Sequence, residues 1–173
     1  GVMTLKFRKA SYEPGVVEFG NDAFAYLQPD GGWGFSNAGL VTDSGAALLI
    51  DTIVDPAPTP TIMAGFNQVR RAKTDHLVTT PHANHTDGSI ERKAGHKCRV
   101  VAPGAEAEKI PAVDLTVREG AKVTVGKLSA NVIETPGHTT GHISYWFHAD
   151  KVAFVGDTLF SIGCGRVFEG TYP

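Results

Sequence analysis

Short apolar segments recur along the whole chain, separated by turns rich in glycine, proline, aspartate and asparagine. Most of these segments are four to seven residues long and rich in β-branched or aromatic side chains, a composition that favours strands. The pattern predicts nine strands, over residues 24–28, 38–42, 46–52, 76–80, 98–102, 122–125, 130–135, 143–147 and 152–158.

Two segments instead show the spacing of a helix. Over residues 60–72 the apolar side chains fall on one helical stripe, at Ile62, Met63, Phe66 and Val69. A shorter helix is expected over residues 89–95, with Asp87 as its N-cap, because aspartate is common at that position. Many strands with few helices predict an α/β domain of mixed or antiparallel sheets whose faces the helices cover.

Composition narrows the classes of function. The length of 173 residues is that of one ordinary domain, and we expect a single domain over residues 1–173. The 16 basic and 18 acidic residues nearly cancel and form no run, which argues against a nucleic-acid or membrane partner and favours a small molecule. No apolar segment reaches the roughly 18 residues of a membrane span.

The cysteines and the first residues bear on location. Cys98 and Cys164 are far apart and belong to no Cys-x-x-Cys motif, so we expect two reduced thiols. The first ten residues lack the hydrophobic stretch of a secretory signal. Together these features predict a cytoplasmic protein, and they leave a homo-oligomer open.

Residues that can bind metal or move protons gather where the predicted strands end. Asp51 ends one strand, His82 and His85 follow another, His138 follows a third, and Asp157 follows a fourth. Loops that leave the strands of an α/β sheet commonly carry the functional site, so these five residues are expected to converge.

Four of these residues make a reasonable set of metal ligands, since histidine nitrogen and carboxylate oxygen bind zinc, and imidazole also suits iron or nickel. If Asp157 bridges two ions, a bound water becomes hydroxide near neutral pH and attacks a polarised carbonyl. Taken singly, each histidine is better explained as an ordinary polar or core residue. Asp51 either orients a ligand histidine or is a turn aspartate at a strand end.

Three segments resemble the metallo-β-lactamase superfamily, namely TTPHANHTDG at 79–88, ETPGHTTGHISYWF at 134–147 and VGDTLFSIGCGRVFEGT at 155–171. The last two are similar to glyoxalase II, the hydroxyacylglutathione hydrolases, and the GDTLF, GCGR and FEGT signature is quite specific to that branch. The resemblance implies the αββα sandwich of this superfamily, with a metal site along one edge of the sheets.

The first segment departs from the family's metal motif, His-x-His-x-Asp-His. Laid without gaps, the motif places Thr80 at the first histidine and Asn84 at the aspartate, while His82 and His85 match the other two histidines. A gapped alignment places His82 at the first histidine and Asn84 at the second. Threonine and asparagine are weak neutral ligands, so both metal positions are expected to be weakened.

The other segments supply the rest of the implied site. His138 matches the histidine of the family's TPGH segment, and Asp157 matches its bridging aspartate. The implied metal ligands are therefore His82, His85, His138 and Asp157.

The resemblance also implies roles around the metal. Asp157 and Asn84 are expected to be catalytic, and Asp51 is expected to support a ligand histidine. Arg166 resembles the family position that contacts the glutathione carboxylate, for which a guanidinium is well shaped. Phe168 stands where some members carry a tyrosine.

Family members continue beyond the length of this chain, into a segment with the last histidine of the second metal position and, in glyoxalase II, a helical domain that helps hold glutathione. We therefore expect a sandwich without its last elements, truncated at its C-terminus. The second metal position and the thiol-binding surface are expected to be incomplete.

The sequence thus predicts a weak metal-dependent hydrolase of the glyoxalase II type, acting on a small thioester such as S-lactoylglutathione. Its cofactor is expected to be one or two zinc ions, with iron or a mixed centre as an alternative. Two other functions stay open. One is an iron persulfide dioxygenase, or a lactone or β-lactam hydrolase, of the same fold, and the other is a catalytically inactive or engineered domain.

Overall fold

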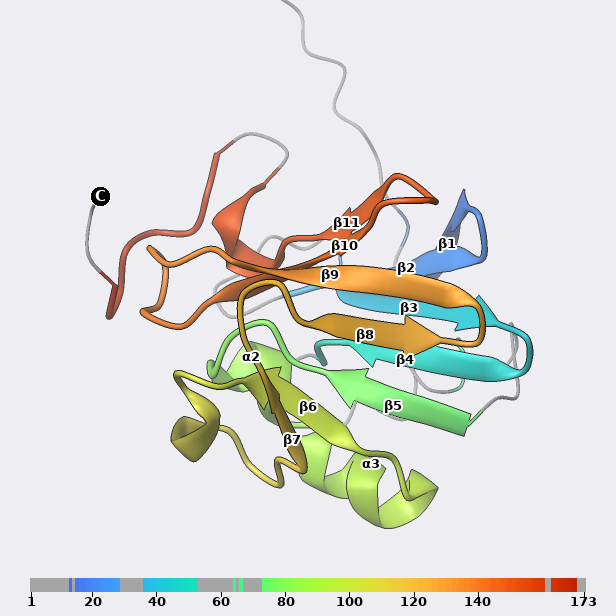
Figure 1. The fold of residues 1–173 in the computed structure, drawn as a ribbon, viewed down its shortest axis with the longest axis horizontal. Coiled ribbons are helices and arrows are strands. Elements are labelled where there is room, and N and C mark those ends of the chain that lie inside the picture. The colour runs from blue at the N-terminus through green and yellow to red at the C-terminus, as the bar shows by residue number, and fades with distance from the viewer. Residues whose placement is uncertain are drawn as a thin grey trace, which may run out of the picture.

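Two β-sheets lie face to face in the computed structural model, which describes residues 13, 15–28, 36–52, 64, 66, 73–160 and 163–170. One sheet has seven strands in the order β1-β2-β3-β4-β5-β6-β7, and the other has four in the order β11-β10-β9-β8. Figure 1 shows the long β9 and β10 crossing in front of the larger sheet.

The strands of the seven-stranded sheet are antiparallel from β1 to β4 and parallel from β4 to β7. Their bounds are β1 (Gly15–Gly20), β2 (Ala23–Leu27), β3 (Ala38–Asp43), β4 (Ala46–Ile50), β5 (Lys73–Leu77), β6 (Val100–Pro103) and β7 (Leu115–Val117).

The four-stranded sheet is antiparallel throughout. Its strands are β8 (Lys122–Val125), β9 (Leu128–Glu134), β10 (Ile143–Phe147) and β11 (Val152–Phe154). The described helices are α2 (Ala83–Thr86), α3 (Ser89–His96), and the short 3-10 helices η1 (Ala107–Lys109) and η2 (Gly156–Thr158).

The main core lies between the two sheets and follows from the two-residue period of the strands. In β10 the buried residues Ile143, Tyr145 and Phe147 alternate along the strand and pack against Leu48 and Ile50 of β4. The hydroxyl of Tyr145 donates to the carbonyl of Val78 at 3.0 Å, which satisfies the polar atom of this buried ring.

A second apolar cluster covers the outer face of the larger sheet, where Leu40 and Leu49 pack with the helical residue Phe66. Most of the helix predicted over residues 60–72 lies outside the described residues, apart from Ala64 and Phe66. These two are helical, and Phe66 is buried as the predicted stripe requires.

A strand overlaps each of the nine predicted segments, although β5 (Lys73–Leu77) shares only two residues with the predicted 76–80, and the architecture is α/β with mixed sheets. Three segments end early, because β4 stops at Ile50, β5 at Leu77 and β11 at Phe154, and the residues after them turn into the site. Strands β1 and β7 were not predicted. The first lies at an exposed edge and the second has only three residues, so neither carries a strong apolar pattern.

The helix predicted over residues 89–95 is confirmed as α3, but its predicted N-cap is wrong. Gly88 occupies that position without a side-chain cap, while exposed Asp87 ends α2. The two helices follow each other without a break, so Asp87 belongs to the end of the first and not to the start of the second.

The two sheets are joined by hydrogen bonds at one edge. The backbone N–H of Ile143, the first residue of β10, donates to the carbonyl of Thr79, just beyond β5, at 3.0 Å. The Tyr145 hydroxyl of β10 bonds across to Val78 in the same way, whereas the bond from the Asp51 N–H to the Leu77 carbonyl, at 2.8 Å, extends the pairing of β4 and β5 within the larger sheet. The loops that follow β4, β5, β9 and β11 can therefore meet at this edge.

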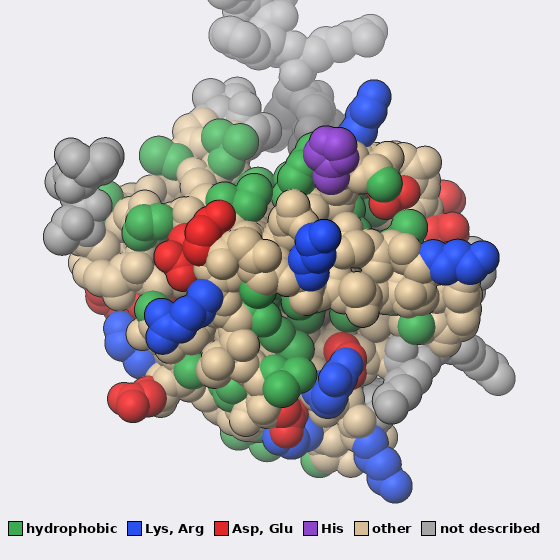
Figure 2. Space-filling model, in the orientation of Figure 1, with side chains coloured by type: hydrophobic (Ala, Val, Ile, Leu, Met, Phe, Trp, Pro, Cys, Tyr) green, Lys and Arg blue, Asp and Glu red, His purple; other side chains and the backbone are tan. Residues whose placement is uncertain are grey.

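The surface and the thiols agree with the composition. Figure 2 shows acidic and basic side chains scattered over the face in view, with neither sign gathered into a patch. Cys98 is buried, Cys164 is exposed, and both are free thiols as predicted. None of the helices in the described part of the chain has the length and apolar character needed to cross a bilayer.

Candidate metal centre

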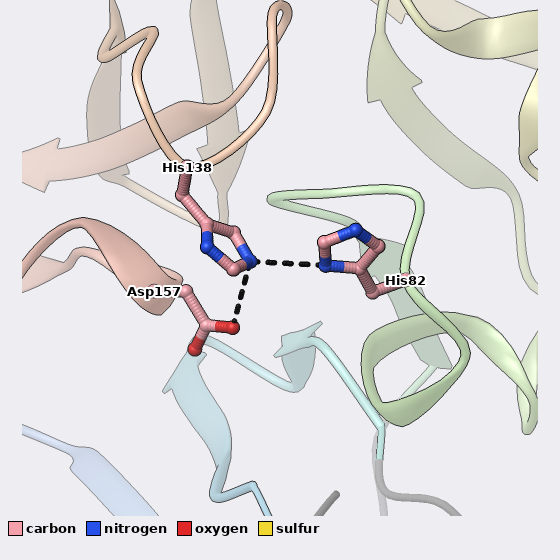
Figure 3. Close-up of side chains that lie close together, drawn as sticks. All are labelled: His82, His138 and Asp157. Carbon is pink, nitrogen blue, oxygen red and sulfur yellow. Dashed lines mark hydrogen bonds and ion pairs between the residues drawn. The ribbon is translucent and has the colours of Figure 1, made fainter. Parts of the chain in front are cut away.

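Three side chains from loops far apart in the sequence converge at the joined edge of the sheets. His82 precedes α2, His138 lies between β9 and β10, and Asp157 lies in η2. One ligand atom of each lies within 4.8 Å of the others. His138 Nε2 is 2.9 Å from His82 Nδ1 and 3.1 Å from Asp157 Oδ2, as Figure 3 shows.

His85 completes the predicted set through its own contact with Asp157. Its Nε2 lies 3.4 Å from Asp157 Oδ2, the same oxygen that faces His138. Its Nδ1 lies 2.9 Å from Asp51 Oδ2, and both side chains are buried. The structure thus brings the four predicted ligands together, and their binding of a metal stays a prediction.

Asp51 is held by two partners besides His85. The backbone N–H and the hydroxyl of Thr79 donate to the two oxygens of Asp51 at 2.8 and 2.7 Å. Asp51 also has a φ of +57°, a conformation that costs free energy for any residue except glycine. Asp51 therefore turns the chain at a strand end and contacts the ring of His85, and its role in supporting a metal ligand stays a prediction.

The electrostatics of His85 follow from its place between two carboxylates. Burial lowers the pKa of His85, but the nearby Asp51 and Asp157 raise it more strongly, to about 10. The carboxylates thus favour a positive charge at this position. A divalent cation at His85 Nε2 would displace that proton, so metal binding there is expected to strengthen as the pH rises.

Asp157 is ionised over the ordinary pH range. Burial raises its pKa, but hydrogen bonding and charge interaction with His85, together with His138 and His142, bring the pKa below the usual value. The backbone N–H of Asp157 donates to His142 Nε2 at 3.1 Å. Burial lowers the pKa of His142 to about 4, so this ring is neutral and carries its proton on Nδ1, towards Thr135 and Thr158.

The donor atoms fit a metal ion. His138 Nδ1 lies 2.7 Å from the carbonyl of Arg166, which only accepts, so Nδ1 carries the proton and the lone pair of the neutral ring is on Nε2. That lone pair faces a carboxylate oxygen. His85 Nε2 is buried without a hydrogen-bond partner in the described structure, and it offers a second lone pair once its proton is displaced. Lone pairs that converge on a carboxylate are an arrangement that a divalent cation stabilises.

Thr80 and Asn84, the two residues that depart from the family's metal motif, lie in different surroundings. Thr80 is fully buried, and its hydroxyl lies 3.4 Å from that of Thr139. Asn84 is half-buried in α2, and its backbone carbonyl accepts from Ser36 at 2.5 Å. Within the described residues, neither side chain makes a hydrogen bond to the four ligands. The catalytic role predicted for Asn84 stays a prediction.

Arg166 lies at the rim of the site. Its carbonyl binds His138, and its exposed guanidinium lies 4.2 Å from the centre of the Phe168 ring. That ring packs edge-on against His82 and His138, with centroids 5.3 and 5.4 Å away. Glu169 Oε2 lies 3.5 Å from His82 Nε2.

Sequence reasoning did not find Thr79 or Glu169 as contacts of the site. Thr79 lies beyond the end of β5, and its polar side chain could have been noticed there beside the histidines. Nothing in the local sequence marks Glu169, because its neighbour His82 is far away in the chain.

The chain is similar in sequence to proteins of a known family. The family model of the metallo-beta-lactamase superfamily matches residues 64–171. A hydroxyacylglutathione hydrolase of Rhodopseudomonas palustris strain BisB5 is 53% identical over 158 residues, which cover 91% of this chain and 56% of that protein. Another, from strain BisB18, is 49% identical over 152 residues, covering 88% and 54%. The chain spans about half the length of the curated relatives it matches.

Solved structures agree on the fold. ETHE1 from Myxococcus xanthus superposes with a TM-score of 0.68 at 26% identity, covering 79% of this chain and 59% of that one. The DIM-1 metallo-beta-lactamase gives a TM-score of 0.71 at 20% identity, covering 92% and 79%. The second likeness shows the fold alone.

Proposed function

Because the chain belongs to the metallo-beta-lactamase superfamily, we propose that it is the metal-binding part of a thioester hydrolase of the glyoxalase II type. The observation that carries this proposal is the convergence of His82, His138 and Asp157, with His85 beside them. The hydroxyacylglutathione hydrolases that are about half identical to this chain support the thioester as substrate.

The proposed cofactor is zinc, held by His82, His138 and Asp157, with His85 at an adjoining position. Neutral imidazole and carboxylate are the ligands that zinc takes in hydrolytic sites. When bound, such an ion acts as a Lewis acid on a carbonyl oxygen and lowers the pKa of water beside it.

The residues of the chain contribute orientation and charge. Asp51 holds the Nδ1 proton of His85, and the Arg166 carbonyl holds that of His138, so that both rings present a lone pair on Nε2 towards Asp157. Asp157 remains ionised and provides the negative charge that a divalent cation needs. In this proposal the partner is a small thioester, the compartment is the cytoplasm, and Asn84 acts on substrate or water.

Substrate is proposed to bind across Arg166 and Phe168. The guanidinium stacked on the Phe168 ring is exposed and held at the rim, where it can pair with a carboxylate of the thiol portion. An exposed charge contact contributes about 1 kcal/mol or less. Replacing Arg166 by alanine is therefore expected to raise KM for S-lactoylglutathione and to change kcat little.

The experiment measures metal and hydrolysis on the same samples. Protein purified without chelator is analysed for metal by mass spectrometry and assayed with S-lactoylglutathione, as wild type and as His138→Ala. The matched control is His148→Ala, which removes an exposed histidine from the turn after β10. Loss of metal and hydrolysis in the first variant only is expected. Equal metal content in all three would reject the proposed site, and iron with oxygen uptake would point to dioxygenase chemistry.

A further inference from the structure

We propose that Glu106 is a positioning residue that fixes the loop carrying His138, and thereby sets the metal affinity of the site. Glu106 lies between β6 and η1 and is distant in sequence from every predicted ligand. The inference rests on the proposed function, because it assumes that His138 holds the metal.

Glu106 is a buried carboxylate whose two side-chain hydrogen bonds both come from the loop that carries His138. Its side chain has an exposed fraction of 0%. The hydroxyl of Thr139 donates to Oε2 at 2.7 Å, and that of Thr140 donates to Oε1 at 3.2 Å. Lys109, half-exposed, lies 3.5 Å from Oε1 and supplies a compensating charge. A buried carboxylate costs free energy unless it is bonded, so the two threonines are tied to this position.

The loop that Glu106 binds is held closely on both sides of His138, by a turn before the contacts with Glu106 and by packing after them. The N–H of Gly137 donates to the carbonyl of Thr139 at 3.0 Å, which closes a turn around His138. A side chain at Gly141 would lie 2.7 Å from Glu106 Cγ and 2.8 Å from Ala105 Cβ. The loop backbone therefore rests directly on residues 105–106, and its place depends on what Glu106 holds.

Thr80 joins the same chain of hydroxyls. Thr139 gives its only hydroxyl proton to the carboxylate of Glu106, which can only accept. In the long 3.4 Å contact between Thr80 and Thr139, Thr80 is therefore the donor. Thr80, which the ungapped alignment places at the first histidine of the family motif, thus supports the His138 loop through its contact with Thr139.

Two groups together determine how His138 is oriented. The Arg166 carbonyl fixes the ring through Nδ1, while Glu106 fixes the backbone on which the ring stands. Without the Glu106 carboxylate, the hydroxyls of Thr139 and Thr140 lose the group to which they donate. His138 Nε2 would then spend less time facing His82 and Asp157, and the metal would dissociate more easily.

The test compares zinc affinity, by competition with a chromophoric chelator, in four folded variants. Glu106→Ala removes both bonds, Glu106→Gln keeps one carbonyl acceptor, and Thr139→Val removes one donor at nearly constant shape. The matched control is Glu108→Ala, an exposed glutamate in the same short helix η1. Glu106→Ala is expected to weaken zinc binding by about 10-fold or more. Glu106→Gln and Thr139→Val should lose less, and Glu108→Ala should stay within about twofold of wild type.

A second readout separates positioning from general stability. Amide hydrogen exchange of the zinc-free protein should be faster in residues 137–141 of Glu106→Ala, with β4 and β9 unchanged. Equal zinc affinity in Glu106→Ala and Glu108→Ala would overturn the proposal. If Glu106→Ala does not fold, Thr139→Val decides in the same way. Unchanged affinity in His138→Ala would instead reject the proposed function itself.

Discussion

A single carboxylate, that of Asp51, determines which nitrogen of His85 faces the metal position. Its Oδ2 accepts from both the Thr79 hydroxyl and His85 Nδ1, which leaves Nε2 as the nitrogen that a metal ion can bind once its proton is displaced. Because hydrogen bonds to the first nitrogen select the tautomer of the second, the function of Asp51 can be tested apart from its contribution to stability.

Replacing Asp51 by asparagine should weaken zinc binding by about 10- to 100-fold. The new amide group donates where Oδ2 accepted, so His85 must accept on Nδ1 and carry its proton on Nε2, where the metal lone pair is needed. Zinc affinity is measured by chelator competition, with the exposed Asp87→Asn as control. An affinity equal to that of wild type would contradict the assignment of the tautomer.

His76 gives a second prediction at the scale of one residue, away from the metal ligands. It is fully buried in β5, and burial, together with the charge of Arg92, lowers its pKa from 6.5 to about 3. Below pH 6.5 the unfolded chain binds a proton that the folded chain does not. Stability from this group is therefore complete above pH 6.5 and is lost as the pH falls towards 3, by about 1.4 kcal/mol per pH unit.

His76→Leu should remove this loss. Its free energy of unfolding, measured with urea between pH 7.5 and 5, should fall less steeply with decreasing pH than that of wild type. The exposed His148→Leu serves as control and should follow wild type. Parallel curves for wild type and His76→Leu would show that His76 does not stay neutral in the fold.

At the scale of elements, the short helix η2 is fixed by a glycine. Gly156 has a φ of +49°, and a methyl group there would lie 2.5 Å from Thr79 Oγ1 and 2.7 Å from His142 Nε2. Both atoms are engaged, the first with Asp51 and the second with the N–H of Asp157. The position of Asp157 thus depends on the absence of a side chain one residue earlier.

Gly156→Ala is expected to destabilise the zinc-free protein by about 1–3 kcal/mol and to weaken zinc binding as well. Gly45→Ala is the matched control, because Gly45 has a φ of +79° with nothing near its Cβ position, so it shares the strain without the contacts. Urea unfolding and zinc titration report the two effects. Equal losses in both variants would mean that the contacts with Thr79 and His142 do not matter.

The elements differ in how far the sequence could predict them. Strands such as β4 and β10 were predicted because nearly all of their residues are buried, which produces a short, almost continuous apolar run bounded by turns. The start of α3 at Ser89 was predicted, but its N-cap was assigned to the wrong residue, because Asp87 has the residue type of an N-cap and is instead the C-cap of α2. Local chemistry cannot tell two consecutive helices from one.

At the scale of the whole molecule, the ligands come from both sheets. His82 and His85 follow β5 of the larger sheet, while His138 and Asp157 follow β9 and β11 of the smaller one. A metal bound by all four would connect the sheets, so it should stabilise the fold as a whole and not only the site.

Zinc at about 100 times its Kd should stabilise the fold by about 2.7 kcal/mol, which corresponds to a rise in Tm of roughly 5–10 °C for a chain of this size. Calorimetry with excess zinc and with EDTA measures the difference. The shift should disappear in His138→Ala, whereas a zinc-independent Tm in the wild type would argue against a native metal site.

The sequence predicted the members of the cluster but not its supports. Asp51, His82, His85, His138 and Asp157 could be found because functional residues follow strand ends. The contacts of Glu106 and Glu169 could not be found, because a partner that is distant in sequence depends on how the whole chain packs. Thr80 shows the same limit, since its contact with Thr139 exists only in the fold.

Each sheet is built from one uninterrupted stretch of chain, and the crossing between them is the exposed turn after Val117. A protease cut between Glu119 and Gly120 would therefore yield two fragments, one with His82 and His85 and the other with His138 and Asp157. Neither fragment alone could assemble the four ligands, but a non-covalent pair could. If the cleaved protein retained zinc, this would show that the two fragments remain associated, because both are needed to supply the four ligands.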